Sequence, residues 1–231
     1  MRAMILAAGL GERMQPLTKD IPKPLLKIAD KSLIELQVEN LVAAGVSAIV
    51  INNHYRGAMI EAALGDGSRF GASIQYSREP TRLETAGGII KALPKLKDDC
   101  FIVVNSDIFT DFDYSRLPTV DGESCLAHLV LVPTVAHNSR GDFGLDPEGL
   151  VHASPIERMP RYVFSGISVL HRKLFAGMPV QPQPLAPILK GAMGKSMVSG
   201  ELYKGVWIDV GTPDRLTQVQ QLQARIEENS I

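Results

Sequence analysis

The chain has 231 residues, of which 45% are hydrophobic and 21% charged, a composition typical of a folded globular protein rather than a disordered one. Its formal net charge of −1 gives no electrostatic argument for binding nucleic acid or a membrane surface. No uninterrupted apolar run approaches the ~20 residues of a membrane-spanning helix, and no signal-peptide pattern precedes the first apolar segment, so we expect a cytoplasmic protein.

The first predicted element is a buried strand over residues 3–6, and a loop that contains Gly9 and Gly11 follows it. Glycine reaches positive φ freely and lets the backbone approach a ligand closely. Successive backbone N–H groups in such a turn form a concave anion site. Arg13 and Lys23 add positive charge, and the prolines on both sides of Lys23 stiffen its backbone. Together these features predict a polyphosphate site.

Two familiar phosphate motifs do not fit this loop. The third glycine of the dinucleotide fingerprint is missing, because Met14 stands at its position. No Gly-Lys-Ser/Thr follows the loop, so it is not a P-loop either.

Short apolar strands alternate with helices through the rest of the first half. Ser32 and Glu35 have the spacing of a capping box and predict the start of a helix that Gly45 ends. The expected helices and strands, in chain order, are 32–45 (helix), 46–51 (strand), 56–64 (helix), 74–77 (strand), 85–93 (helix) and 101–105 (strand). This alternation predicts an α/β fold, a Rossmann-like, mainly parallel mixed sheet flanked by helices.

The second half is less regular and indicates a smaller, mixed region that completes a pocket. The expected elements are strands at 126–132, 143–145, 151–153, 162–170 and 206–209, a helix at 184–193, and a final helix that begins near Pro213. On the final helix Leu216, Val219, Leu222 and Ile226 lie close to one face, which we expect to pack on the domain rather than to bind a partner.

Two aspartates lie at the carboxyl ends of predicted strands. Asp107 follows the strand 101–105, and Asp209 ends the strand 206–209. In open α/β sheets ligands bind at those ends. A lone aspartate there is more often a turn residue or a helix cap, but a pair near a phosphate loop suits Mg²⁺, which takes oxygen ligands and keeps substrate phosphates in its shell.

The histidines and cysteines give no sign of another metal site. The five histidines have no metal-type spacing and are interpreted as structural or surface residues. Cys100 and Cys125 lie far apart in the sequence, and we expect buried free thiols rather than a disulfide.

The string Leu6–Thr18, closing at Pro22-Lys23-Pro24-Leu25, resembles the signature of the sugar-phosphate nucleotidyltransferases. That pattern is Leu-Ala-Ala-Gly-x-Gly-x-Arg-Met/Leu-x-Pro-Leu-Thr followed by Pro-Lys-Pro-Leu, and every fixed position is matched. The resemblance implies the nucleotide-diphospho-sugar transferase fold in a single nucleotidyltransferase domain over 1–231. Residues 1–110 would form its nucleotide-binding half, and 111–231 its sugar-binding half and C-terminal helix.

The resemblance also implies a reaction, the Mg²⁺-dependent transfer of a nucleotidyl group to a sugar 1-phosphate with release of pyrophosphate, by a monomer or small homo-oligomer. UTP and N-acetylmuramate α-1-phosphate, in peptidoglycan recycling, are the expected substrates. Mannose 1-phosphate with GTP, and glucose 1-phosphate with dTTP or UTP, are the alternatives. A non-catalytic sugar-nucleotide sensor on the same fold would be expected to have lost Arg13, Lys23 or an acidic ligand, and all are present.

Residue roles follow from the same resemblance. Arg13 is expected on the leaving pyrophosphate and Lys23 at the α-phosphate as catalytic residues, with Asp107 and Asp209 as metal ligands. The nucleotide-binding candidates are Ala8, Gly9, Gly11, Glu12, Arg13, Lys23, Glu84, Thr85, Gly87 and Asn105. The sugar-binding candidates are Asp142, Ser165, Gly166 and Asp209.

The chain departs from the family pattern in three places. Ser106 and Ala86 stand where relatives have glycine, beside the metal ligand and in the nucleobase-contact segment. The lysine that many relatives place on the sugar phosphate is absent, and Arg158 or Arg161 could substitute for it, although a solvated surface arginine is the commoner case.

Trp207 is expected either to line the sugar pocket or to lie in the core.

Overall fold

The computed structural model describes residues 1–154 and 159–228. Its α-helices are α1 (Leu33–Ala43), α2 (Gly57–Leu64), α3 (Glu84–Leu96), α4 (Leu185–Met193) and α5 (Pro213–Glu228). Its strands are β1 (Arg2–Leu6), β2 (Lys27–Ile28), β3 (Lys31–Ser32), β4 (Ala48–Asn53), β5 (Ser73–Arg78), β6 (Cys100–Asn105), β7 (Ile108–Thr110), β8 (Ala127–Val132), β9 (Phe143–Leu145), β10 (Val151–His152), β11 (Arg161–His171), β12 (Val198–Leu202) and β13 (Trp207–Asp209). Short 3-10 turns include η1 (Glu12–Met14) and η2 (Lys23–Leu25).

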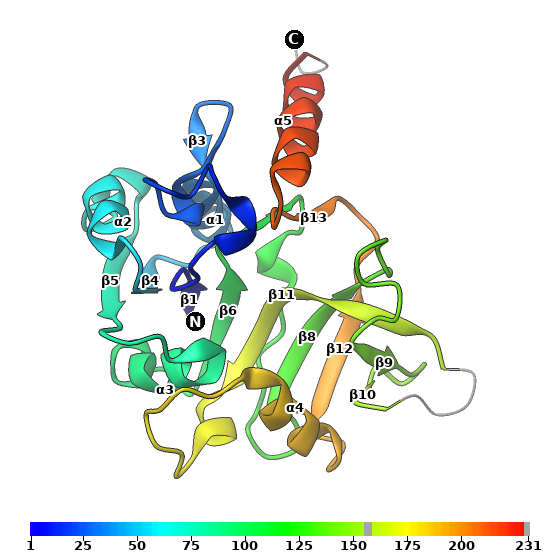
Figure 1. The fold of residues 1–231 in the computed structure, drawn as a ribbon. Coiled ribbons are helices and arrows are strands. Elements are labelled where there is room, and N and C mark those ends of the chain that lie inside the picture. Colours follow the sequence, from blue (N-terminus) through cyan, green and yellow to red (C-terminus); the bar gives the residue numbers. More distant parts are fainter. Residues whose placement is uncertain (155–158, 229–231) are drawn as a thin grey trace.

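One mixed sheet of nine strands runs through both halves of the molecule (Figure 1). Strands β5, β4, β1 and β6 lie side by side and parallel, with β1 near the centre. Strand β11 pairs antiparallel with β6 and with β8, and β12 then pairs parallel with β8. Strands β9 and β10 extend the sheet from the start of β11. The predicted α/β class with a mixed sheet is therefore confirmed.

Helices cover both faces of this sheet because its central strands are apolar on both sides. Along β1, Ala3 and Ile5 are fully buried in a cluster with residues of α1 and α2. The intervening Met4 is fully buried in a second cluster, with residues of α3 and α4. Successive side chains of a strand point to opposite faces, so the apolar run predicted at 3–6 supplies both layers of the core.

Local signals at helix ends agree with the structure. The Glu35 carboxylate accepts a hydrogen bond from the backbone N–H of Ser32 at 2.8 Å, which is one half of the predicted capping box. After α1 the chain turns through Gly45, whose φ is 81°. The predicted helices and strands all occur, with ends that differ by up to three residues, as where α3 continues to Leu96.

Strand β12 is not predicted from the sequence, and neither are the short strands β2, β3 and β7. The segment Val198–Leu202 contains Gly200 and Glu201, which are depleted in strands. The position of Gly200 explains its residue type, since a Cβ there would stand 2.9 Å from the carbonyl oxygen of Leu129 on the neighbouring strand. Tertiary pairing with β8, rather than local propensity, makes this segment a strand.

Helix α5 packs on the domain through its first half. Leu216 and Val219 are buried in a third cluster that includes Met14 and Val210. Ile226, on the same face, is 44% exposed, and Figure 1 shows the helix extending away from the sheet. The expectation of packing is confirmed for the first two turns.

The structure also bears on the expected state of the cysteines and on the expected absence of a membrane-spanning helix. Cys100 and Cys125 are both free thiols, as predicted, but each is half-buried and not fully buried as expected. Within residues 1–154 and 159–228, no helix is long and apolar enough to cross a membrane.

Candidate active site

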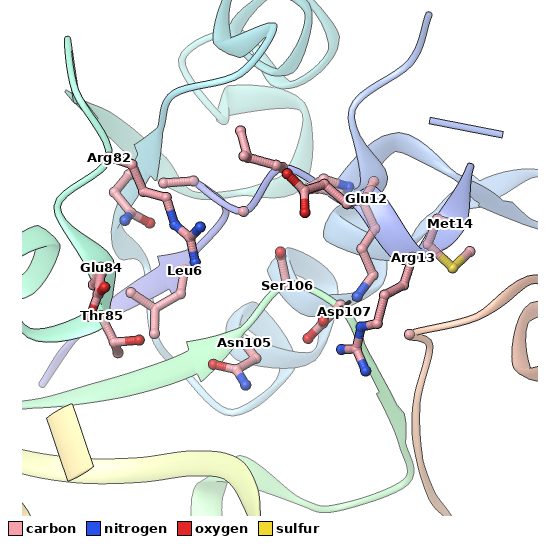
Figure 2. A pocket seen from close by; sticks show the side chains of 18 of the residues that line it. Leu6, Glu12, Arg13, Met14, Arg82, Glu84, Thr85, Asn105, Ser106 and Asp107 are labelled. Carbon is pink, nitrogen blue, oxygen red and sulfur yellow. Dashed lines mark hydrogen bonds and ion pairs between the residues drawn. The ribbon is translucent and has the colours of Figure 1, made fainter. Parts of the chain in front are cut away.

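A cavity of about 450 Å³ opens at the carboxyl ends of β1 and β6, where ligands bind in open α/β sheets. Its size lies within the usual range for small-molecule sites. The loop after β1, the ends of β4 and β6, the segment before α3 and Gly211 line it. Figure 2 shows Arg82, Glu84 and Thr85 on one side and Glu12, Arg13 and Asp107 on the other.

The loop after β1 folds back on itself and so positions Lys23. Gly11 has a φ of 67°, and a Cβ there would stand 3.1 Å from the Cβ of Lys23 and from the Cγ2 of Thr18. The Thr18 hydroxyl donates to the carbonyl oxygen of Gly11 at 2.8 Å. Glycine is required at position 11 because the backbone is left-handed there and its neighbours are close.

Lys23 forms an ion pair with Asp107, and the side chains are 12% and 31% exposed. The backbone on both sides of Asp107 is held in place. The N–H of Ser106 donates to the carbonyl oxygen of Leu6 at 3.1 Å, and the buried Gln37 side chain donates to the carbonyl oxygen of Ile108 at 2.6 Å. A cation and a carboxylate are therefore fixed together on the wall of the cavity.

Asp209, the second candidate metal ligand, lies at the same end of a two-stranded ribbon as Asp107. Strand β13 pairs antiparallel with β7, and the N–H of Val210 donates to the carbonyl oxygen of Asp107 at 2.7 Å. Mg²⁺ is commonly held by one or two carboxylates plus substrate phosphates. Among the described residues no group of three or more His, Cys, Asp and Glu is arranged to hold a metal. An ion of this kind needs only one or two carboxylates, which Asp107, on the cavity wall, and Asp209, at the same end of the ribbon, would supply.

Asp209 has two further neighbours that the sequence does not predict. Its Oδ1 pairs with Nη1 of Arg215, in the first turn of α5. The same oxygen lies 3.0 Å from Nε2 of His137, a residue interpreted from the sequence as structural or exposed. Both carboxylates of the candidate metal pair are thus ion-paired in this structure.

A buried polar network supports the opposite side of the cavity. Asn52, at the end of β4, accepts from the N–H of Ala7 at 2.9 Å and donates to Glu79 Oε1 at 2.7 Å. The other oxygen of Glu79 accepts from the N–H of Leu83 at 3.0 Å, and Glu79 is only 4% exposed. The carboxylate therefore ties the loop before α3 to the ends of β1 and β4.

Most of the predicted nucleotide-binding residues come together in the cavity. Its lining includes nine of the ten candidates, namely Ala8, Gly9, Gly11, Glu12, Arg13, Lys23, Glu84, Thr85 and Asn105. Gly87 is the exception. Its N–H and that of Ala86 donate to the carbonyl oxygen of Gln183, and a Cβ on Gly87 would stand 2.2 Å from the carbonyl oxygen of Gln181. The structure places the Gly87 backbone against this segment instead of against the cavity.

The predicted sugar-binding residues do not line the cavity. The Asp142 carboxylate accepts from the N–H of Phe164 at 2.8 Å, and the Ser165 hydroxyl donates to the carbonyl oxygen of Val130 at 2.7 Å. Trp207 donates from Nε1 to the carbonyl oxygen of Ser165 at 2.9 Å and packs on the core. In this structure these side chains hold β11 and its neighbouring loops together.

The two candidates for the missing lysine can be placed only in part. Arg158 lies outside the described residues. The guanidinium of Arg161 donates to the carbonyl oxygens of Arg140, Gly141 and Asp142, at 2.9, 3.2 and 2.7 Å. Arg161 therefore fixes the loop before β9.

Sequence reasoning missed several residues of the site. Asn52 and Glu79 line the cavity, and each stands at or just after the carboxyl end of a parallel strand. The rule that selected Asp107 could have found them. This rule does not apply to Arg82, His137 and Arg215, because none of them directly follows a parallel strand. Arg82 and His137 lie in loops, and Arg215 lies on α5.

Gly166 supports Asn105, and its replacement gives a first prediction. Its φ is 83°, and a Cβ there would stand 2.5 Å from Nδ2 of Asn105. We expect Gly166→Ala to lower the free energy of unfolding by about 1–3 kcal/mol and to weaken nucleotide binding, since Asn105 lines the cavity.

Thermal unfolding and nucleotide titration would measure both effects of Gly166→Ala. Gly177→Ala is the matched control, because Gly177 has a φ of 73° and a Cβ added there would have no neighbouring atom within 4 Å. It adds backbone strain alone and should leave nucleotide binding unchanged. Equal nucleotide affinity in both variants would contradict a role for Asn105.

Known proteins resemble this chain over nearly its whole length. A family model described as "Nucleotidyl transferase" matches residues 2–225. The chain is 46% identical to the N-acetylmuramate alpha-1-phosphate uridylyltransferase of Neisseria meningitidis serogroup B, over 96% of this chain and 98% of that protein. It is 33% identical to the protein of the same name from Caulobacter vibrioides, over 91% and 92%.

Solved structures confirm the fold. The chain resembles the crystal structure of HddC from Yersinia pseudotuberculosis with a TM-score of 0.77, covering 96% of this chain and 98% of that one. The sequence identity is 22%, so this likeness bears on the fold alone. The expected nucleotide-diphospho-sugar transferase fold is confirmed.

Proposed function

The chain belongs to the nucleotidyl transferase family, and we propose that it transfers a uridylyl group from UTP to N-acetylmuramate α-1-phosphate, giving UDP-N-acetylmuramate and pyrophosphate. The 46% identity to a uridylyltransferase of that name supports the choice of both substrates. Mg²⁺ as the metal, a role in peptidoglycan recycling and the cytoplasmic location are parts of the same proposal.

One observation supports this function best. The cavity brings Arg13 and Asp107 to one side and Glu84 and Thr85 to the other (Figure 2), and Lys23 lies beside Asp107 as its ion-pair partner. A nucleoside triphosphate has a polyanion at one end and a hydrogen-bonding base at the other. Arg13 and Lys23 supply positive charge for the triphosphate, and Glu84, Thr85 and the backbone around them supply hydrogen-bonding groups for the base.

The reaction needs no general base. A phosphate oxygen of the sugar 1-phosphate, already an anion, attacks the α-phosphorus of UTP. The bond from that phosphorus to the oxygen bridging to the β-phosphate breaks, and pyrophosphate leaves with the electron pair. Catalysis then consists of positioning and charge neutralisation. We assign Lys23 to the α-phosphate and Arg13 to the departing pyrophosphate.

Asp107 and Asp209 would hold the metal, which when bound neutralises phosphate charge and orients the triphosphate. In this structure the Lys23 ammonium pairs with Asp107. A cation held by that carboxylate would weaken its attraction for the ammonium, which would leave Lys23 available to a phosphate.

The proposal is tested by measuring pyrophosphate release with Mg²⁺ across a matrix of substrates. UTP, dTTP, GTP, CTP and ATP are each combined with the 1-phosphates of N-acetylmuramate, N-acetylglucosamine, glucose and mannose. We expect the highest kcat/KM for UTP with N-acetylmuramate α-1-phosphate. The 46% identity to a protein with that name is the reason.

Other outcomes would change the conclusion in defined ways. A preference for mannose 1-phosphate with GTP, or for glucose 1-phosphate with dTTP or UTP, would keep the mechanism and replace the substrates. Nucleotide binding without pyrophosphate release for any pair would contradict the enzyme and favour a sugar-nucleotide sensor.

A further inference from the structure

Arg215 is a largely buried cation beside the candidate metal pair. It lies in the first turn of α5, and its side chain is 14% exposed. Its Nη1 pairs with Asp209 Oδ1 and lies 2.9 Å from Nε2 of His137. A buried guanidinium needs a counter-anion, since taking a charge out of water without a partner is costly.

A second guanidinium, that of Arg13, lies near the same glycine as Arg215 does. Arg13 and Gly211 line the cavity, and Arg215 lies behind Gly211. A Cβ on Gly211 would stand 2.6 Å from Nη2 of Arg215 and 3.4 Å from Nη2 of Arg13. Gly211 lines the cavity, and the absence of a side chain there leaves room for both groups. Two like charges this close repel each other. Their arrangement is favourable when an anion lies between or beside them.

The Asp209 carboxylate, which forms the ion pair with Arg215, is also a candidate metal ligand. If Asp209 ligates a metal, as the proposed function requires, its negative charge is shared with that cation. Arg215 then lacks a full counter-charge in a site where it is largely buried. A phosphate group would supply the missing negative charge, and the planar guanidinium can donate two parallel hydrogen bonds to it.

We propose that Arg215 binds the phosphate group of the sugar 1-phosphate, an inference that rests on the proposed function. Two observations favour this phosphate over the triphosphate. Arg215 and its neighbours Asp209 and His137 all come from the half of the chain after residue 110. The triphosphate is already matched by Arg13 and Lys23 on the loop after β1. Arg215 thus brings the nucleophile to the metal side of the cavity.

The experiment compares Arg215→Gln and Arg215→Lys with the wild type, using the preferred substrate pair from the matrix. We expect the KM for the sugar 1-phosphate to rise about 10- to 100-fold in Arg215→Gln, the effect of losing a charge-assisted hydrogen-bonded pair. The KM for the nucleotide, and the KM for pyrophosphate in the reverse reaction, should change less than about twofold. Arg215→Lys keeps the charge without the fork and should restore part of the affinity.

Two further measurements separate binding from stability. Sugar 1-phosphate binding is measured by calorimetry in the presence of Mg²⁺ and a non-hydrolysable UTP analogue, which needs no turnover. Arg225→Gln, an exposed arginine later on α5, is the matched control and should behave as the wild type. If Arg215→Gln unfolds at a lower temperature, the comparison is made with Arg215→Lys, which keeps the ion pair with Asp209.

The outcomes distinguish this inference from the proposed function. A rise in the KM for pyrophosphate in place of the KM for sugar 1-phosphate would overturn the inference, and so would unchanged values for both. If the matrix selects another sugar 1-phosphate, the proposed function fails and Arg215 is tested with that sugar. If no pair is turned over, calorimetry with the sugar 1-phosphates still decides whether Arg215 binds them.

Discussion

Replacing Lys23 with alanine is expected to lower kcat by about two to three orders of magnitude, the usual effect of removing one preorganised charge donor from a transition state. The Lys23 ammonium lies beside Asp107 on the cavity wall, and its side chain is only 12% exposed. In the proposed reaction it meets the α-phosphate, where charge changes most as the nucleophile enters. A group that acts mainly in the transition state lowers kcat far more than it raises KM.

The measurement is steady-state pyrophosphate release, with the Mg²⁺ concentration at half-maximal rate as a second readout. Lys23→Ala should leave that concentration unchanged or lower it, because Asp107 loses a competing cation. Lys19→Ala is the matched control. The exposed Lys19 lies on the same loop, and its contacts with Tyr55 and Arg56 use its backbone carbonyl. A decrease of less than tenfold in Lys23→Ala would contradict the catalytic assignment.

The lining of the cavity by the loop after β1 and the end of β6 could be predicted because local sequence determines these residues. The loop from Gly9 to Lys23 follows one buried strand, and positive φ at Gly11 is a property that glycine supplies itself. Asn105 and Asp107 follow from one further rule, that parallel strands present their carboxyl ends at one edge of a sheet. No long-range contact had to be known for these residues.

The structural contacts of the sugar-binding candidates could not be predicted because distant strand pairing determines them. Strand β11 changes register against β8 between Phe164 and Ile167, which marks a bulge at Ser165 and Gly166. Within this bulge the Ser165 hydroxyl donates to the carbonyl oxygen of Val130, which lies 35 residues earlier in the chain. In the sequence, a serine before a glycine resembles a turn that binds a ligand. The hydrogen bond of the Ser165 hydroxyl to Val130 can be found only once the register of β11 against β8 is known.

His137 and Arg215 illustrate the same limit at the metal pair. His137 lies on a loop and Arg215 on the final helix, 78 residues apart, and their side chains are 2.9 Å from each other. Neither has a neighbour in the sequence that suggests a site. Both contact Asp209, which the pairing of β13 with β7 places at the same end of the ribbon as Asp107.

Asp107→Asn is expected to lower kcat/KM by about a thousandfold or more and to weaken metal binding. A catalytic metal contributes several kcal/mol of charge stabilisation, and each ~1.4 kcal/mol is a factor of ten in rate. The substitution keeps the size of the side chain and removes the charge that a hard cation such as Mg²⁺ requires. Lys23 would also lose its ion-pair partner, so a change in thermal stability is measured alongside activity.

Direct titration with Mn²⁺ in the presence of UTP separates the metal from the ion pair. Asp113→Asn is the matched control, because Asp113 is exposed outside the cavity and its Oδ1 accepts from the N–H of Ser115, a contact that asparagine can keep. Asp113→Asn should bind Mn²⁺ with the affinity of the wild type and show the same kcat/KM. If Asp107→Asn lost activity yet bound Mn²⁺ with unchanged affinity, Asp107 would not be a ligand. Its role would then be to hold Lys23 in place, and Lys23→Ala combined with Asp107→Asn would be no slower than Lys23→Ala alone.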